Sequence, residues 1–260
     1  MSSTNATALS ANPFSLHGQS ALVTGAGRGL GAAIASALAS AGATVFLLSR
    51  NQAELDTLAE HIGKQGGQAR AMVCDVTDPK AVQAVLNDIE SLDILVNNAG
   101  ANIPENFLDV DTEQLDKLML LNVRSVFLTA QAAARKIMRN GEQGGSIINI
   151  SSQMGHVGAV RRSVYCMTKH AVEGLTKSMA LELAQYNIRV NTVAPTFVLT
   201  PMTEAFFQDQ AFQGWVMDRL PMGRLLPAQD VALAVCYLAS QAAAMVTGTS
   251  LKIDGGWTAQ

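Results

Sequence analysis

Tyr165 and Lys169 have the residue types and the spacing that acid–base chemistry requires. In a helix, residues four apart lie on one face, about one turn from each other. A phenol alone is a weak acid near neutral pH because its ordinary pKa is about 10, and a nearby cation favours the phenolate and lowers that pKa. The pair therefore predicts a proton donor and acceptor, with a half-buried tyrosine beside an extended lysine as the structural alternative.

A glycine-rich segment near the N-terminus, Thr24-Gly-Ala-Gly-Arg-Gly-Leu-Gly31, has the composition of a phosphate-binding loop. Glycines let backbone N–H groups approach a pyrophosphate at a helix N-terminus, where the helix dipole favours negative charge. The segment lies between a predicted strand and a predicted helix, as a dinucleotide site requires. Two registers of the pattern remain open, and the second one uses Gly27, Gly29 and Ala32.

The residues after the second predicted strand bear on the choice of cofactor. A carboxylate at this position would bind the ribose 2′-hydroxyl of NAD. Here Ser49 and Arg50 follow the strand, and Arg28 lies inside the glycine-rich segment. Guanidinium groups bind phosphate through charge-assisted hydrogen bonds. We therefore predict NADP as the preferred cofactor with NAD possible, although either arginine could also be a solvated surface residue.

Strand and helix patterns alternate along the chain. Apolar runs predict strands at 20–23, 44–48, 69–74, 92–96, 145–150, 188–193 and 250–253. Helices are expected at 32–41, 51–65, 112–139, 163–185 and 230–240, with one more that Asp78 caps and Pro79 begins. This alternation predicts an α/β fold: a single-domain doubly wound Rossmann fold over 14–260, with about seven parallel strands and helices on both faces. We also expect a flexible tail at 1–13 and a substrate-loop insertion at 196–222.

Composition restricts the classes of function. The chain has 260 residues, of which 48% are hydrophobic and 15% charged, as suits one large domain. A net charge of -3 argues against nucleic acid or an anionic membrane as a partner. The three cysteines form no Cys-x-x-Cys pair, so no metal site or disulfide framework is expected. With no signal-peptide pattern and no apolar run of about 18 residues, we predict a cytoplasmic protein.

From about Leu16 to the C-terminus, these motifs resemble the short-chain dehydrogenase/reductase family. Its Thr-Gly-x-x-x-Gly-x-Gly matches Thr24 to Gly31, and its Asn-Asn-Ala-Gly matches residues 97–100. Its helix asparagine matches Asn122, its catalytic serine matches Ser152, and its Tyr-x-x-x-Lys matches Tyr165 and Lys169. The resemblance implies an NAD(P)-dependent oxidoreductase that interconverts a secondary alcohol and a ketone or aldehyde.

The resemblance also implies a role for each matched residue. Ser152 would hold the substrate oxygen, Tyr165 would transfer the proton, and Lys169 would bind the nicotinamide ribose and shift the Tyr165 pKa. Asn122 would hold a water that relays protons, and Asp75 would contact the adenine amine. The expected cofactor contacts are Gly25, Arg28, Gly29, Leu30, Gly31, Ser49, Arg50, Asp75, Val76, Asn98, Ala99, Gly100, Tyr165, Lys169, Pro195, Val198 and Thr200.

One position departs from the family pattern. Thr196 stands where the family usually has a glycine after the sixth strand, and a β-branched residue would be strained there if the backbone needed positive φ. Thr200 keeps the family's threonine on the nicotinamide side.

The motifs near the two ends of the chain and the candidate substrate-contacting residues bear on the class of substrate. Phe14-Ser-Leu-His-Gly and Asp254-Gly-Gly-Trp resemble sugar and sugar-acid members of the family, such as gluconate 5-dehydrogenases and glucose 1-dehydrogenases. We therefore expect a sugar, sugar acid or polyol, although residues 101–104 carry no basic side chain for an acid group. Alternatives are a 3-oxoacyl-carrier-protein reductase and, from a different class, a catalytically silent dinucleotide-binding sensor. The candidate substrate contacts are Asn102, Gln153, Met154, His156, Arg161 and Met202, with Arg162 also able to bind a carboxylate.

The helices expected at 123–138 and 164–183 are apolar on more than one stripe, which requires burial on two sides. The sheet covers one side, and a second subunit is the expected partner for the other. By family resemblance we predict a homotetramer.

Overall fold

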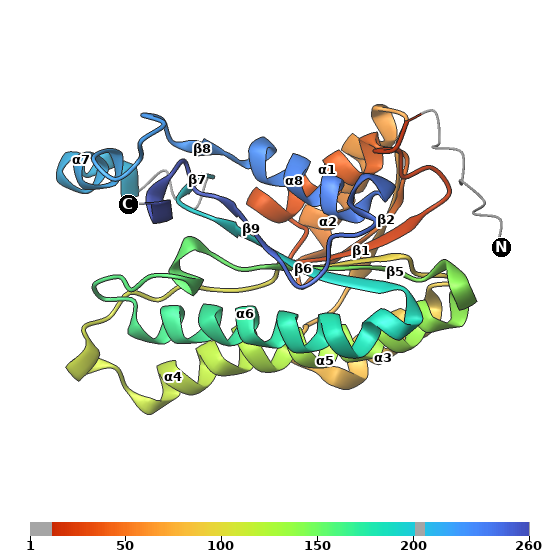
Figure 1. The fold of residues 1–260 in the computed structure, drawn as a ribbon, viewed down its shortest axis with the longest axis horizontal. Helices are drawn as coiled ribbons and strands as arrows, with labels where there is room; N and C mark the ends of the chain where they lie inside the picture. The colour runs from red at the N-terminus through yellow and green to blue at the C-terminus, as the bar shows by residue number, and fades with distance from the viewer. Residues whose placement is uncertain (1–11, 201–205, 260) are drawn as a thin grey trace, which may run out of the picture.

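One parallel sheet with helices on both faces forms the centre of the protein (Figure 1). The computed structural model describes residues 12–200 and 206–259. The sheet has seven strands in the order β3-β2-β1-β4-β5-β6-β9, and every neighbouring pair is parallel. The strands are β1 (Ser20–Thr24), β2 (Thr44–Ser49), β3 (Gln68–Val73), β4 (Ile94–Asn97), β5 (Gly145–Ile150), β6 (Ile188–Pro195) and β9 (Ser250–Ile253). The predicted doubly wound fold is confirmed, and the strand order changes direction between β1 and β4, where open α/β sheets bind ligands.

Strand positions follow the sequence prediction closely. β4 begins at Ile94 rather than Leu92. The side chain of the intervening Asp93 binds Ser20, the first residue of β1. Its Oδ2 accepts hydrogen bonds from Ser20 N at 2.8 Å and from Ser20 Oγ at 2.9 Å.

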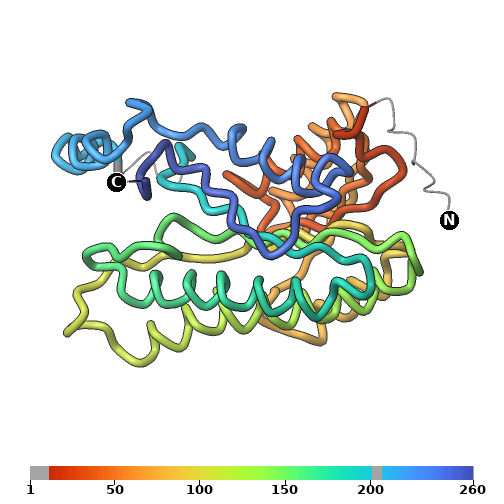
Figure 2. Tube along the Cα trace, in the orientation of Figure 1, coloured from red at the N-terminus to blue at the C-terminus, as the bar shows by residue number. Residues whose placement is uncertain are grey.

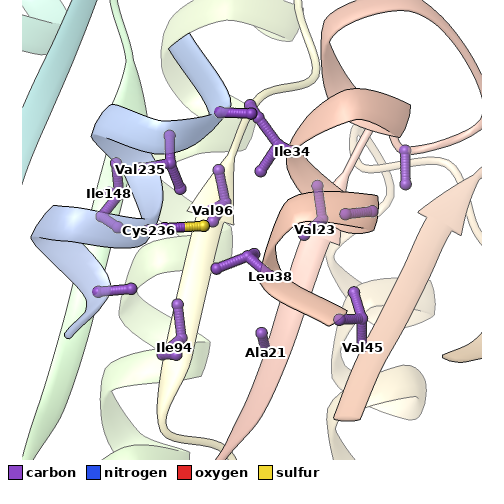
Figure 3. Close-up of a cluster of buried hydrophobic side chains, with 14 of the residues drawn as sticks. Ala21, Val23, Ile34, Leu38, Val45, Ile94, Val96, Ile148, Val235 and Cys236 are labelled. Carbon is purple, nitrogen blue, oxygen red and sulfur yellow. The ribbon is translucent and has the colours of Figure 1, made fainter. Parts of the chain in front are cut away.

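On one face of the sheet, α1 (Gly29–Ser40) packs against α8 (Ala228–Ala239), with α2 (Gln52–Lys64) beside it (Figure 1). Figure 3 shows Ile34 and Leu38 of α1 and Val235 of α8 over the strand residues Val23 and Val96, all fully buried. Burial of an aliphatic side chain of this size stabilises a fold by about 1.5–3 kcal/mol. This cluster fixes the N-terminus of α1 above the carboxyl end of β1.

The opposite face carries α3 (Pro79–Asp88), α4 (Thr112–Met119), α5 (Ser125–Ile137) and α6 (Ser163–Leu183) (Figure 1). The expected N-caps are confirmed: Asn51 Oδ1 accepts from Ala53 N at 3.1 Å, and Asp78 Oδ1 accepts from Lys80 N at 2.8 Å. The predicted helical stretch at about 112–139 is confirmed, but its hydrogen-bonding pattern changes part-way along. A π-helical turn, η2 (Leu120–Arg124), separates α4 from α5, and such turns are frequent at functional sites.

The described parts of segment 196–222, residues 196–200 and 206–222, lie at the end of the molecule where the carboxyl ends of the strands and the N-terminus of α6 are found (Figure 2). Its described part holds β7 (Val198–Leu199), η6 (Phe206–Gln208) and α7 (Gln210–Met217), so the expected short helices are present. A small sheet that pairs β7 with β8 (Leu226–Pro227) was not predicted. Within the segment, the Phe197 ring contacts the Phe212 ring at 5.5 Å, and its contact with Trp257 at 5.6 Å ties the segment to the C-terminal region.

The remaining elements are short 3₁₀ turns: η1 (Phe107–Asp109), η3 (Met138–Gln143), η4 (Gln153–Gly155), η5 (Ala184–Tyr186), η7 (Gln241–Ala243) and η8 (Trp257–Ala259). The predicted tail at 1–13 lies outside the described residues except for Asn12 and Pro13. Within 12–200 and 206–259, none of the helices combines the length and the apolar character that crossing a membrane requires.

Candidate active site

Ser152 and Tyr165 meet beyond the carboxyl end of β5. Ser152 lies two residues after the strand, Tyr165 lies in the first turn of α6, and a hydrogen bond links their side chains. Ser152 Oγ also accepts from Met154 N at 3.1 Å and donates to Gln153 Oε1 at 2.7 Å. A hydroxyl has one proton, so Ser152 must turn from Gln153 to donate to a substrate oxygen.

The expected downward shift of the Tyr165 pKa is wrong. Burial raises the pKa of Tyr165 to about 12, and the hydrogen bond with Ser152 acts more weakly in the opposite direction. The sequence argument considered the lysine and not the desolvation of the phenolate, which is the larger effect here. The raised pKa favours the protonated phenol at neutral pH, and a role for Tyr165 as proton donor stays a prediction.

Lys169 lies one turn further along α6 and is 7% exposed. Its Nζ donates to Ile150 O at 2.8 Å and lies 5.6 Å from the centre of the Tyr165 ring. Burial lowers the pKa of Lys169 to about 8, while the charge of Glu173 raises it. The ammonium has three donors, so it can hold further oxygen acceptors beside Tyr165.

Asn122, in the π turn, joins two parts of the site. Its Oδ1 accepts from Ala101 N at 2.9 Å, and its Nδ2 donates to Ala101 O at 2.8 Å and Thr168 Oγ1 at 3.2 Å. These contacts hold the loop after β4 against α6. The contact on α6 is Thr168, the residue before Lys169. The water relay stays a prediction.

The glycine-rich loop has the shape of an anion cradle. Gly25 and Gly29 have positive φ, at 63° and 56°, and a Cβ on Gly31 would lie 2.1 Å from Gly25 O. Asn98 Nδ2 holds the loop by donating to Thr24 O at 2.9 Å and Gly25 O at 3.1 Å. No side chain caps the N-terminus of α1. The structure thus favours the register of Gly25, Gly29 and Gly31, and this cradle fits the pyrophosphate of a dinucleotide.

Two exposed arginines flank the end of β2. Arg28 Nη1 lies 3.7 Å from Glu54 Oε1, and Arg50 Nη1 lies 4.0 Å from Asp75 Oδ2. Asp75 Oδ1 is occupied by Thr77, whose N and Oγ1 donate to it at 2.9 and 2.8 Å, and these bonds lower the Asp75 pKa. Its other oxygen faces Arg50, so an adenine contact stays a prediction.

The nicotinamide-side residues reach the phosphate loop. A Cβ on Gly29 would lie 3.7 Å from Thr200 Cβ, so the segment after β6 and the glycine loop are neighbours. Among the described residues other than glycine, positive φ occurs at Arg161 and Asn187, so Thr196 is not strained there. The other expected cofactor contacts are Leu30, Val76, Ala99, Gly100, Pro195 and Val198, of which Val76, Pro195 and Val198 are buried.

The candidate substrate residues lie in different surroundings. Gln153 and Met154 are buried beside Ser152, whereas Asn102 and Arg161 are exposed. His156 instead turns to Ser250, with its Nε2 2.9 Å from Ser250 Oγ. Met202 lies outside the described residues.

Arg162 is placed three residues before Tyr165, at the N-terminus of α6. Its Nη1 donates to Arg161 O at 3.0 Å, and its buried Nε has no partner among the described residues. Burial and the neighbouring Arg161 lower the Arg162 pKa.

Sequence reasoning assigned no bonding role to Thr24 and did not identify Glu173, and both residues hold the site together. Thr24 Oγ1 accepts from Asn98 N and Ala99 N, both at 3.0 Å, and so fixes the loop after β4. Glu173, 6% exposed and one turn beyond Lys169, bonds to β6 and β9. The spacing of four residues between Lys169 and Glu173 could have predicted that the two side chains share one face of a helix. The partners of Glu173 on β6 and β9 are distant in sequence and could not be predicted in this way.

Comparison with known proteins decides the family. The profile described as Enoyl-(Acyl carrier protein) reductase matches residues 25–258. The chain belongs to the short-chain dehydrogenase/reductase family. It is therefore an oxidoreductase of the kind that acts on CH–OH groups.

Similar members of the family are named for sugar chemistry. L-xylulose reductase of Bos taurus is 39% identical over 94% of this chain and 98% of its own. Gluconate 5-dehydrogenase of Gluconobacter oxydans is 38% identical over 94% and 96%. The structure of a putative 2-deoxy-D-gluconate 3-dehydrogenase from Agrobacterium tumefaciens, with bound NADP, superposes with a TM-score of 0.91 at 40% identity over 96% of this chain and all of that one. A nicotinamide dinucleotide is therefore the cofactor class of this short-chain dehydrogenase/reductase.

Proposed function

We propose that this protein interconverts a secondary alcohol and a ketone on a sugar, sugar acid or polyol, with NADP as its preferred cofactor. The observation that carries the proposal is the hydrogen-bonded pair of Ser152 and Tyr165, with the Lys169 ammonium 5.6 Å from the Tyr165 ring. A proton donor, a hydroxyl and a cation are the groups that a developing alkoxide needs.

The chain fits the cofactor through features of its own. The uncapped N-terminus of α1 and the Gly25–Gly31 cradle, which a Cβ on Gly31 would fill, would hold the pyrophosphate. Lys169, with donors to spare, would hold the nicotinamide ribose. The bound nicotinamide supplies or accepts the hydride.

In the direction of reduction, Ser152 and Tyr165 donate hydrogen bonds to the carbonyl oxygen. As hydride adds to the carbonyl carbon, negative charge develops on this oxygen, and Tyr165 transfers its proton to it. The alcohol forms, and Lys169 stabilises the resulting phenolate through its charge. Oxidation reverses each step.

Two observations support the choice of cofactor and substrate class. Arg28 and Arg50 are highly exposed, at 71% and 81% of their side-chain surface, and their long ion pairs leave donors for a 2′-phosphate. The names of the similar proteins favour sugars and sugar acids, and the unpartnered Nε of Arg162 beside Tyr165 would suit an acid group. The alternative is a carrier-protein reductase, as the description of the matched family suggests.

The test is a spectrophotometric screen of nicotinamide oxidation and reduction. Ketoses, sugar acids, polyols and a 3-oxoacyl thioester are each offered with NADP(H) and NAD(H). We expect turnover of the sugar or polyol class with NADP(H); turnover of the thioester alone would identify the alternative. Lack of all turnover, with tight cofactor binding, would indicate a sensor.

Tyr165→Phe separates an enzyme from a sensor. Removing the hydroxyl eliminates the proton donor while keeping the half-buried ring, so kcat should fall by roughly 10²–10⁴-fold. Cofactor binding, measured by calorimetry, should stay within about twofold of wild type if the ring alone contacts the cofactor. A variant with wild-type turnover would refute the assignment of Tyr165.

A further inference from the structure

The side chain of Glu173 is a buried carboxylate at the junction of four elements. It is 6% exposed and projects from α6 towards β6, β9 and the segment after η4. Thr192 Oγ1 of β6 donates to its two oxygens at 3.0 and 2.9 Å, and Ser250 Oγ of β9 donates to Oε1 at 3.1 Å. His156 Nε2 lies 3.3 Å from the same oxygen. Burial of a carboxylate is costly unless it is paired and hydrogen-bonded, and here several donors converge on it.

The number of protons on each group determines which groups in this network donate and which accept. Ser250 has one proton, which it donates to Glu173, so its oxygen accepts from His156 at 2.9 Å. His156 Nε2 is therefore a donor, and Glu173 receives hydrogen bonds without giving any. This pattern of donors fits a carboxylate, whose oxygens only accept.

The network connects the elements that carry the catalytic groups. His156 follows Ser152 by four residues, and Glu173 follows Lys169 by one helical turn. Between them the chain passes close to the helix: a Cβ on Gly155 would lie 3.2 Å from both Glu173 Cγ and Lys169 O. The position of the Ser152 loop relative to α6 thus depends on contacts to Glu173.

Charge links the same residue to Lys169. The lysine is 7% exposed, and within residues 12–200 and 206–259 its Nζ donates a hydrogen bond to the neutral carbonyl of Ile150. Tyr165 on its own helix is protonated at neutral pH, Asn122 and Thr168 nearby are neutral, and β6 and β9 face Glu173 with hydroxyls. His156 is the other titratable group at the carboxylate. Glu173 therefore supplies the negative charge that opposes the cost of burying the ammonium.

We propose that Glu173 is a positioning residue of the active site, which keeps Lys169 charged and holds the Ser152 loop against α6. The proposal rests on the proposed function for its catalytic consequence, but the charge of Lys169 can be measured without any turnover. Glu173→Gln keeps the size of the side chain and removes its charge. Glu182→Gln makes the same change on an exposed residue further along α6 and is the matched control.

The measurement is the titration of Lys169 by NMR of ε-carbon-labelled lysine, with Lys169→Met to assign the signal. We expect the midpoint to fall by about one pH unit in Glu173→Gln, since loss of an opposite charge nearby has effects of this size. It should stay unchanged in Glu182→Gln and return close to wild type in Glu173→Asp. The alkaline limb of reductase activity should move to lower pH together with the midpoint.

An unchanged midpoint in Glu173→Gln would overturn the proposal.

Thr192→Val is a second test, because it removes one hydrogen-bond donor to Glu173 and keeps the charge of Glu173. Turnover should fall in this variant, while the Lys169 midpoint stays near wild type. A midpoint that falls as far in Thr192→Val would show that packing, and not charge, controls Lys169, and would also overturn it. If Glu173→Gln does not fold, Glu173→Asp replaces it. A clearly lowered Lys169 midpoint in Glu173→Asp, which keeps the charge, would also overturn the proposal. If no substrate turns over but the midpoint moves as expected, the proposed function fails and the role of Glu173 stands.

Discussion

At Lys169 the effects of burial and charge oppose each other, and burial is the larger. Burial lowers the pKa of Lys169 from 10.5 to about 8. Burial of the neighbouring Tyr165 raises the pKa of Tyr165 to about 12. Both shifts favour the neutral form, as desolvation must. The tyrosine keeps its proton throughout the range in which the lysine loses its own, so the two groups can be told apart by pH.

We expect the initial rate of carbonyl reduction to fall as pH rises past about 8, because the cation that stabilises the phenolate is lost there. For a single ionisation the decline is about tenfold per pH unit. The measurement is kcat/KM for the ketone between neutral and strongly alkaline pH, with Lys177→Met, an exposed residue of α6, as control. A decline that begins only near the ordinary pKa of lysine, about 10.4, would contradict the shift.

The preference for NADP is tested at Arg50. Its guanidinium is 81% exposed and lies 4.0 Å from Asp75, so its donors are available to a 2′-phosphate. Arg50→Ala should raise KM for NADPH by roughly 10- to 100-fold, since a charge-assisted hydrogen bond contributes roughly 1.5–3 kcal/mol, and should change KM for NADH little. Lys64→Ala removes an exposed cation from α2 and should affect neither. Equal effects on both cofactors would mean that Arg50 does not contact the 2′ position.

At the scale of elements, the phosphate loop and α1 can be tested with a matched pair of glycines. A Cβ on Gly31 would meet Gly25 O at 2.1 Å, whereas a Cβ on Gly63 in α2 meets nothing within 4 Å. Gly31→Ala should destabilise the protein by about 1–3 kcal/mol and abolish dinucleotide binding. Gly63→Ala should stabilise it by up to about 1 kcal/mol. Thermal unfolding and calorimetry measure the two effects, and comparable stability of both variants would refute the close approach.

Much of the arrangement of elements could be predicted from local sequence. Asn51 and Asp78 cap helices because their own side chains reach backbone N–H groups two and three residues on. The strand before and the helix after the glycine-rich segment are likewise local patterns. Conversely, the π turn at Asn122 accompanies bonds to Ala101 and Thr168, 21 and 46 residues away.

The candidate site shows the same division. Its residue types and spacings identified Ser152, Tyr165 and Lys169, whose relation lies within one strand-to-helix unit. The direction of the Tyr165 pKa shift depends on burial, which no spacing records. Glu173 binds Ser250 across 77 residues, so its role required the assembled sheet.

At the scale of the whole molecule, α5 and α6 expose large apolar side chains on the face turned away from the sheet. Phe127 is 46% exposed, Met167 45% and Leu181 83%. Exposed large apolar side chains are typical of protein interfaces, and a stable interface buries about 1,200–2,000 Å². We propose that these helices form a subunit interface of a homotetramer.

Phe127→Glu tests this interface, because a charge placed in a packed apolar contact is costly to desolvate. Wild type should sediment as a tetramer at micromolar concentration, and the variant should dissociate to smaller species while its circular dichroism stays unchanged. Met245→Glu places the same charge on a residue that is 95% exposed and lies outside these helices, and it should remain tetrameric. A monomeric wild type would exclude the tetramer, and a tetrameric Phe127→Glu would place the interface on another face. Dissociation with retained turnover would show that each subunit holds a complete active site, as expected when Ser152, Tyr165 and Lys169 all come from one chain.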